Sequence, residues 1–341
     1  MEITLENESV RAVVSDLGAT LDSLFDKTKG REHAWPYDPA VWPRRTHLCF
    51  PVCGKLLDGE YIHEGVRYSM PMHGFLREKK FRLAERSAES ATLSFTSDRE
   101  TLAIYPFTFE VLVRTTLIPN GIEIAYRVEN RGKSEMPYSI GSHYNYLVPF
   151  NAEEQLGDFE IDFGSVQSAG RIEFSEGFVS GRSEDVFHGA GSLPLGGLFS
   201  RGAVAFALSD LTTSTVTLRG TKSGFSTSLG MENFDHLLLW APNDAASFVC
   251  LEAWAGLPDR IGHDKTLKNK WAVGYLDSIS ESVPMPCQHR TPWSSAWSHP
   301  MAKYPNGTVT GNKAMDTNCM VAAEFLVDMG FDLDQMCGAE V

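Results

Sequence analysis

Two histidines and a glutamate stand in stretches of the chain where ionisable side chains are unexpected. Glu252 lies in the apolar run FVCLEAW, His143 lies in SIGSHYNY, and His73 lies in PMHGFLREKKF. A carboxylate in an apolar strand either faces solvent or is held inside for a purpose, because unpartnered burial is costly. Imidazole is the commonest acid–base group near neutral pH, but many histidines only pack. Each of the three is therefore an ordinary packed or surface residue, or a proton-transfer group.

The segments that must position these groups show period-two alternation up to about residue 280. In FTFEVLVRTTL the apolar side chains alternate, the turn residues Pro119, Asn120 and Gly121 follow, and IEIAYRV alternates again. This pattern predicts a hairpin. Further strands are predicted at ATLSFTS, AVAFALS, STVTLRG, HLLLWAP and SFVCLEAW. The number of strands and the near absence of helical periodicity predict an all-β, antiparallel fold, a large sandwich rather than a small barrel.

Composition excludes several classes of function. The chain has 341 residues and a formal net charge of −14, which disfavours nucleic acid and anionic membranes as partners and is compatible with a neutral small substrate. The N-terminal MEITLENESV lacks the features of a secretory signal, and no apolar run is long enough for a membrane helix. The six cysteines form no CxxC or zinc-type spacing, which favours free thiols in a reducing cytoplasm. A redox pair of Cys49 and Cys53 is the less favoured alternative.

The pattern changes after about Ser282. A loop rich in Pro, Ser and Trp is followed by MDTNCMVAAEFLVDMGF, for which we expect one short helix, begun by Asp316 or Thr317 and ended by Gly330. We therefore predict a β-sandwich domain over residues 1–283 and a C-terminal loop and helix extension over 284–341, whose role the sequence leaves open.

Four stretches, read in order, carry a resemblance to a known family. CFPVCGKL, HGF, GSHYNY and CLEAW are similar to the motifs LFPxxGxL, HGF, GxHxxF and CLEPW of the aldose 1-epimerase (galactose mutarotase) family, in its divergent bacterial branch. The resemblance covers about residues 1 to 276. The chain departs from the motifs at Lys55, where arginine is frequent, at Ala253, where proline is frequent, and at Tyr146, where phenylalanine is usual.

The resemblance implies a β-supersandwich with an open concave face that holds a monosaccharide. It places His143 as general acid, Glu252 as general base and His73 as a second histidine that binds the sugar near its ring oxygen. It implies a monomer or homodimer that uses no cofactor and no metal. Further candidates for sugar binding are aromatic, basic or acidic residues near the motifs: Arg44, Arg45, Lys55, Phe75, Tyr144, Trp240, Trp254 and Asp235.

Interconversion of α and β anomers needs proton transfer at two oxygens of the sugar, and neither a metal nor a redox step. A carboxylate next to imidazoles favours the charged form of each, so we expect an ionised base and a charged acid near neutral pH. Two alternatives stay open. A hexose 6-phosphate is the substrate if the basic residues Arg44, Arg45, Lys55, Arg77, Lys79 and Lys80 hold a phosphate. Alternatively, the protein binds carbohydrate without turnover. The identity of the sugar is not predicted.

Overall fold

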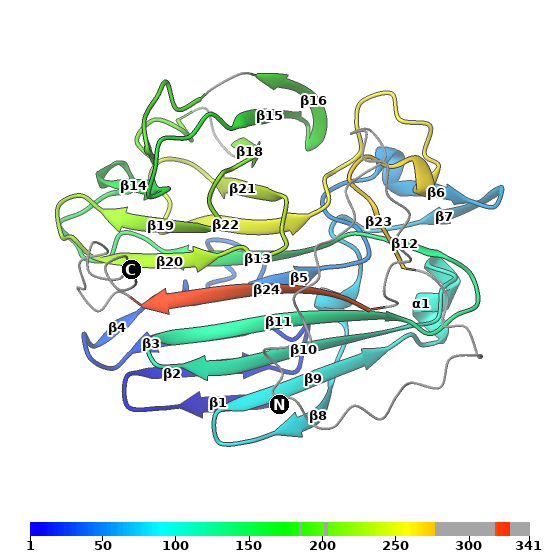
Figure 1. The fold of residues 1–341 in the computed structure, drawn as a ribbon, viewed down its shortest axis with the longest axis horizontal. Helices are drawn as coiled ribbons and strands as arrows, with labels where there is room; N and C mark the ends of the chain where they lie inside the picture. Colours follow the sequence, from blue (N-terminus) through cyan, green and yellow to red (C-terminus); the bar gives the residue numbers. More distant parts are fainter. Residues whose placement is uncertain (184–185, 201–203, 277–317, 328–341) are drawn as a thin grey trace, which may run out of the picture.

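The computed structural model describes residues 1–183, 186–200, 204–276 and 318–327 (Figure 1). Within these ranges the fold is almost entirely β, with one short α-helix, α1 (Arg99–Ile104), and every pair of named strands runs antiparallel. The 3-10 turns are η1 (Leu57–Gly59), η2 (Leu76–Glu78), η3 (Leu156–Asp158) and η4 (Leu267–Asn269). The all-β antiparallel prediction is confirmed.

The largest sheet that the described residues form contains nine strands. In spatial order its strands are β17 (Ser192–Pro194), β14 (Phe159–Asp162), β19 (Thr215–Gly220), β20 (Ser226–Gly230), β24 (Asn318–Val327), β11 (Gly121–Asn130), β10 (Phe109–Ile118), β9 (Ser90–Thr96) and β8 (Arg82–Arg86). Of these, β24, β11, β10, β9 and β8 follow one another down the lower half of Figure 1. The predicted hairpin is the β10–β11 pair, in which Val111 faces Val128 and Ile118 faces Gly121.

A second sheet, of seven strands within the described ranges, positions the candidate site. Its strands are, in order, β16 (Phe178–Ser183), β15 (Gly170–Ser175), β18 (Val204–Ser209), β21 (His236–Ala241), β22 (Phe248–Ala255), β13 (Ile140–Leu147) and β5 (His47–Cys49). β22 and β13 pair along most of their length and carry two of the four motifs.

Smaller sheets complete the described fold. One is formed by β1 (Glu2–Glu6), β2 (Val10–Ser15), β3 (Leu21–Asp26) and β4 (Arg31–Glu32); the two-stranded ones are β6 (Glu60–His63) with β7 (Val66–Ser69), and β12 (Met136–Tyr138) with β23 (Gly274–Leu276).

The two large sheets share one hydrophobic core. Val111 and Val113 of β10 and Leu237 and Leu251 of the seven-stranded sheet belong to the same cluster of buried side chains. Because successive side chains of a strand point to opposite faces, the residues that alternate with these point away from that core. The other face of the seven-stranded sheet is therefore where the polar residues of β5, β13 and β22 are expected to lie.

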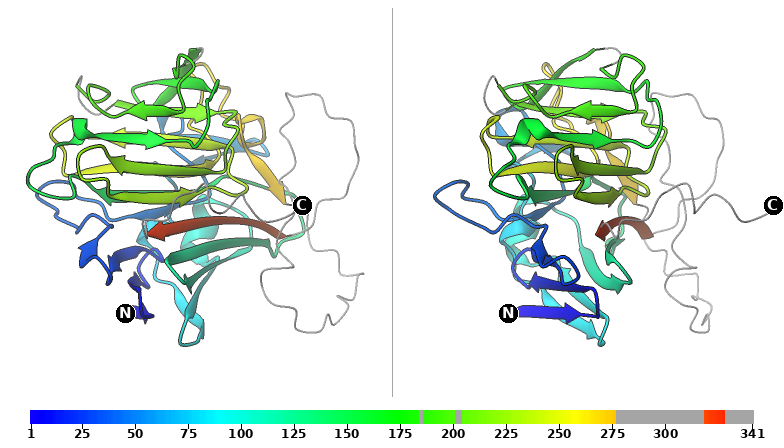
Figure 2. Two further views of the ribbon diagram at one scale, coloured as in Figure 1. Left: turned by 60° about the vertical axis from the view of Figure 1, so that its left-hand side comes forward. Right: turned by 90° about the vertical axis from the view of Figure 1, so that its left-hand side faces the viewer.

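The helix predicted in the C-terminal segment is wrong. Residues Asn318–Val327 form strand β24, which inserts between β11 and β20 and is drawn in red in Figure 1; both views of Figure 2 show it beside β11. A strand flanked on both sides satisfies its backbone groups with neighbours, so tertiary context overrides local helix propensity. The predicted ends of the helix and the boundary at 283/284 lie outside the described residues, and the division into two regions stays a prediction.

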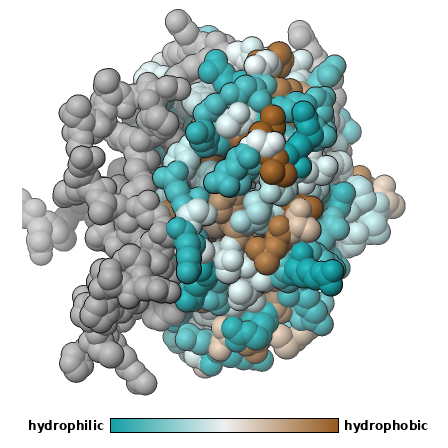
Figure 3. Space-filling view, turned by 90° about the vertical axis from the view of Figure 1, so that its right-hand side faces the viewer, coloured by the Kyte–Doolittle hydropathy of each residue, from teal (hydrophilic) through white to brown (hydrophobic). Residues whose placement is uncertain are grey.

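The surface shows no extended apolar face in the view of Figure 3, where hydrophobic side chains form small groups among hydrophilic ones over the described residues. Among those residues, no helix has the length and apolar character needed to cross a membrane.

Candidate active site

Strand alternation brings Glu252 and His143 to the same face of the seven-stranded sheet. In β22, Leu251 and Ala253 belong to the main core, so Glu252 between them faces the opposite side. In β13, Tyr144 belongs to the main core, and His143 therefore also faces away from it. The two strands are paired, and the Nε2 atom of His143 lies 3.4 Å from Oε1 of Glu252. An acid–base pair is thus formed across two neighbouring strands.

The edge strand β5 adds a second histidine beside this pair. His47 lies directly opposite His143 in the β13–β5 register. Their imidazole rings stack, with ring centroids 4.4 Å apart. Sequence reasoning missed His47, although its alternation with Leu48, a core residue, follows the same period-two rule as the predicted strands.

His73 reaches the cluster from a tight turn rather than from a strand. The amide of Gly74 donates to the carbonyl of Pro71 (2.9 Å), and both His73 and Gly74 have positive φ angles of 65° and 71°. Such φ values are costly for a residue with a side chain and are found mainly where the structure needs them. A Cβ atom at Gly74 would lie 1.9 Å from the carbonyl oxygen of Phe50, which explains the glycine of HGF.

The turn fixes the position and tautomer of the His73 ring. Its ring centroid lies 5.4 Å from that of His143, edge to face. The backbone N–H of Gly54 donates to Nδ1 of His73 over 3.2 Å, so in the neutral ring Nδ1 accepts and Nε2 carries the proton. The three residues predicted to carry out catalysis therefore lie together.

Burial dominates the electrostatics of this cluster. It raises the pKa of Glu252 well above its ordinary value and lowers the pKa of His143 to about 4. Burial, followed by the neighbouring His143, also lowers the pKa of His47 and His73. The expectation of an ionised carboxylate beside a charged imidazole is wrong for this arrangement, because desolvation outweighs the attraction between the two groups. These directions favour a pair that holds a single shared proton, on the carboxyl group, beside a neutral imidazole.

Two of the predicted aromatic residues lie at the cluster. The ring of Trp254 lies 5.4 Å from that of His73, and its indole N–H donates to the carbonyl of Ser142 over 3.1 Å. The ring of Trp240 lies 6.4 Å from that of His143. Trp42, which sequence reasoning did not select, lies against Trp240 with a centroid separation of 4.6 Å. The indole rings therefore provide apolar surface next to His73 and next to His143.

Tyr144 and Phe75 are not at the cluster. The Tyr144 hydroxyl is hydrogen-bonded to that of Tyr126 in the main core, on the opposite face of β13 from His143. The Phe75 ring lies in the same core, 6.3 Å from the ring of Phe50. Both residues support the site from behind the sheet.

Asp235 and Lys55 lie to the sides of the cluster formed by His73, His143 and Glu252. Asp235 lines a separate cavity of about 580 Å³ with His236 and Trp271, while its backbone N–H donates to the carbonyl of Trp254. The Lys55 ammonium group donates to the carbonyl of Glu176 over 2.9 Å. No sugar contact follows from these positions alone.

The basic residues near the first two motifs have different surroundings. Arg45 pairs with Asp22 (3.0 Å), and Arg44 pairs with Glu78 (3.2 Å). Arg77, which was not among the selected site residues, is largely buried, and its charge lowers the pKa of His47, His73 and His143. Among the described residues its Nε atom has no hydrogen-bond partner, and it lies 3.7 Å from Oε1 of Glu78.

Comparisons with known proteins agree with this fold. The family model described as aldose 1-epimerase matches residues 1–188. The chain is 31% identical over 280 residues to the plasmid-encoded protein LacX of Lactococcus lactis subsp. lactis, a match that covers 79% of this chain and 93% of LacX.

Solved structures from two lactobacilli share the fold. One is a galactose mutarotase related enzyme from Lactobacillus acidophilus, with a TM-score of 0.80, 23% identity and coverage of 97% of this chain and 99% of that one. The other is a galactose mutarotase-like protein from Lactobacillus casei, with a TM-score of 0.80, 23% identity and coverage of 96% and 100%. The fold is therefore that of the galactose mutarotase-like β-sandwich proteins. By the family match and its LacX relative, the chain belongs to the aldose 1-epimerase family.

Proposed function

We propose that this protein interconverts the α and β anomers of a free aldohexose. The observation that carries the proposal is the buried pair of Glu252 and His143, 3.4 Å apart, with His73 beside it. A protein that only bound sugar would have no need for an acid–base pair whose charged forms burial disfavours. Membership of the aldose 1-epimerase family supports anomer interconversion as the reaction of this pair.

The reaction moves one proton on and one proton off the sugar. Glu252 as the carboxylate takes the proton of the C1 hydroxyl, while His143 as the imidazolium gives a proton to the ring oxygen. The bond between C1 and the ring oxygen breaks, the C1–C2 bond of the aldehyde rotates, and the same transfers in reverse close the ring on the other face. His73 donates from Nε2 near the ring oxygen.

The shared proton makes this cycle compatible with burial. The neutral pair and the charged pair contain the same number of protons, and they differ only in which side of the 3.4 Å contact holds the proton. Moving it from Glu252 to His143 produces the base and the acid together. No exchange with solvent is needed within one turnover, and each well-placed acid or base contributes about 10²–10⁴-fold to the rate.

A phosphorylated hexose is the second candidate substrate. It is favoured by the buried guanidinium of Arg77, which is close enough to Arg44 for the Arg44 charge to lower its pKa. The Glu78 carboxylate lies 3.2 Å from Arg44 and 3.7 Å from Arg77, and a phosphate is an anion that two such guanidinium groups would hold in its place. The other basic candidates are engaged: Lys79 pairs with Asp98 and Glu100, and Lys80 pairs with Asp16.

Polarimetry with freshly dissolved sugars tests both candidates. The purified protein should accelerate the mutarotation of α-D-galactose or α-D-glucose above the spontaneous rate, and the 6-phosphate of the same sugar serves as the matched comparison. A preference for the phosphate that Arg77→Gln abolishes would assign the second substrate class. Sugar binding detected by calorimetry with no acceleration for any aldose of a panel would leave only the non-catalytic reading.

A further inference from the structure

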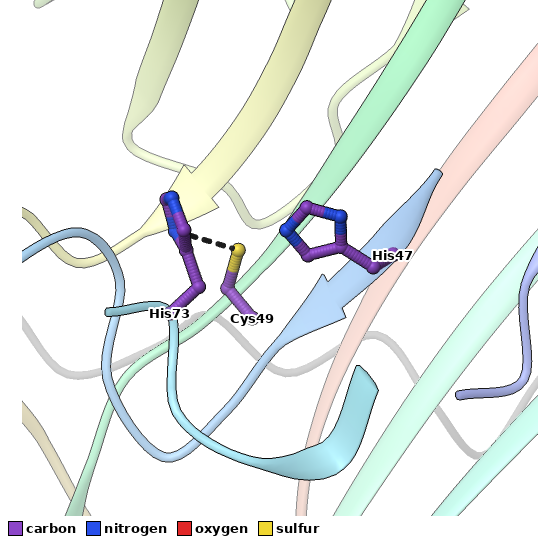
Figure 4. A group of neighbouring side chains, drawn as sticks. All are labelled: His47, Cys49 and His73. Atoms are coloured by element: carbon purple, nitrogen blue, oxygen red, sulfur yellow. Dashed lines mark hydrogen bonds between the residues drawn. The ribbon is translucent and has the colours of Figure 1, made fainter. Parts of the chain in front are cut away.

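Three potential metal ligands meet at the edge of the candidate active site. His47, Cys49 and His73 each offer one ligand atom, these atoms lie within 4.8 Å of one another, and all three residues are buried. His47 and Cys49 alternate along β5, and His73 comes from the HGF turn. Figure 4 shows Cys49 between the two imidazole rings.

His47 has the orientation of a metal-binding histidine. Its Nδ1 atom contacts the carbonyl oxygen of Arg45 at 2.8 Å, so Nδ1 carries the proton and Nε2 carries the lone pair. A backbone carbonyl on the far nitrogen is a usual support for a ligating imidazole, because it fixes the tautomer and the ring orientation. Within the described part of the chain, Nε2 of His47 is buried without a hydrogen-bond partner, which is unfavourable unless something binds there.

The contact between Cys49 and His73 has nearly the spacing of two ligands on one ion. Sγ of Cys49 lies 3.2 Å from Nδ1 of His73, where the thiol proton fills the gap. A tetrahedral zinc ion that bound both atoms would hold them about 3.5 Å apart, given usual Zn–S and Zn–N lengths. Binding of the ion therefore replaces both the thiol proton and the contact of the Gly54 N–H with Nδ1, and it moves Sγ and Nδ1 apart by a few tenths of an ångström. The proton leaves to solvent.

From this geometry we infer that His47, Cys49 and His73 bind a thiophilic divalent metal ion, Zn²⁺ first among them. One thiolate and two imidazoles suit zinc, whereas magnesium and calcium prefer oxygen ligands. Three protein ligands leave a fourth position for water. The second group of potential ligands, His143, Cys250 and Glu252, contains the acid–base pair and is the alternative that the experiment must exclude.

Occupancy would inhibit anomer interconversion, a consequence that rests on the proposed function. The ion on Nδ1 would fix the ring of His73, whose Nε2–H the proposed reaction places near the ring oxygen of the sugar. It would also hold the ring of His47 in place, and because that ring stacks on His143, it would restrict the movement of the proposed acid. The metal binding itself does not depend on the protein being an epimerase.

Cobalt(II) provides a direct readout of the binding, because a cysteine thiolate ligand gives a near-ultraviolet charge-transfer band. Chelator-treated protein titrated with Co²⁺ should develop this band with a stoichiometry of one ion, and Zn²⁺ should displace it. Cys49→Ser should abolish the band. His47→Gln, which keeps the thiol, should weaken Zn²⁺ affinity in calorimetry by at least about tenfold. Cys53→Ser and Cys250→Ser are matched buried-cysteine controls and should leave the band and the affinity unchanged.

Several results would overturn the inference. They are the absence of one-to-one binding by the unaltered protein, a band that persists in Cys49→Ser, or a band lost in Cys250→Ser, which would place the ion on the other group. Inhibition is scored separately, as the Zn²⁺ concentration that halves each variant's own metal-free rate, and Cys49→Ser should need at least about ten times more. If the protein shows no anomerisation but retains the cobalt band, the proposed function fails and the metal site stands.

Discussion

Glu252 and His143 titrate as one unit, because the two groups lie 3.4 Å apart and are both buried. Burial raises the pKa of the carboxyl group and lowers that of the imidazole to about 4. The first macroscopic step below neutrality is therefore the addition of a second proton to the pair, and the step above it is the loss of the shared proton. Only the singly protonated pair holds both a base and an acid.

The pH dependence of kcat/KM follows from this pair. We expect the enzyme-catalysed rate, corrected for spontaneous mutarotation, to change less than about twofold between pH 7 and 5.5, and to fall on the acid side near pH 4. A histidine with an ordinary pKa would place the acid limb near pH 6.5. Polarimetry in a series of low-concentration buffers gives the profile, and an acid limb centred near 6.5 would contradict the account.

At the scale of the element, alternation explains how much of the site could be predicted. Period two along β13 and β22 is visible in the sequence. The face on which Glu252 and His143 lie therefore follows once it is known which residues of either strand point into the core. Which residues point into the core depends on which face of the sheet packs against the nine-stranded sheet, and that depends on contacts between residues far apart in the sequence. The same applies to Tyr144, whose position next to His143 in β13 puts it on the opposite face.

Strand β24 shows the corresponding limit for the fold. Residues 318–327 have a composition that a helix also accepts, and local propensity therefore predicted one. The strand is determined by β11 and β20, which lie about 90 to 200 residues earlier and whose backbone groups it pairs with. No short-range pattern in the sequence indicates that β11 and β20 leave room for a strand between them. The β10–β11 hairpin was predictable because its turn is local.

A proline substitution tests the pairing of β24. Leu326 faces Gly121 on one side and Ser228 on the other, so its N–H is within the sheet whichever way it points. Leu326→Pro removes that donor and should lower the free energy of unfolding by roughly 1–3 kcal/mol more than Leu326→Ala, which loses the side chain but keeps the N–H. Urea denaturation measures both variants, and equal midpoints would contradict the placement of β24.

For the whole molecule, the buried histidines of the site should make the folded state less stable in acid. Burial lowers the pKa of His47, His73 and His143 in the folded protein, while the unfolded chain has histidines near 6.5. Below pH 6.5 the unfolded chain therefore binds more protons, and stability falls as the pH falls, until about pH 4 for His143. Glu252 acts in the opposite sense, because its pKa is raised on folding.

The free energy of unfolding should decrease on acidification between pH 6 and 5, because the lowered pKa of three histidines outweighs the raised pKa of Glu252, and each group contributes at most about 1.4 kcal/mol per pH unit. Urea titrations across this range measure the slope. His47→Gln should reduce it by at most about 1.4 kcal/mol per pH unit. A stability that stays constant or rises as the pH falls to 5 would show that these histidines are not buried together.

The most direct test of the central claim is the kinetic coupling of Glu252 and His143. Glu252→Gln and His143→Gln should each reduce kcat for anomer interconversion by about 10²–10⁴-fold. The kcat of the double variant should be little lower than that of the less active single variant, because the two residues act as a unit. Glu160→Gln, which alters a half-buried carboxylate paired with Arg219 on the other large sheet, is the control and should retain full activity. Near-normal kcat in Glu252→Gln, or effects of the two substitutions that multiply, would contradict the account.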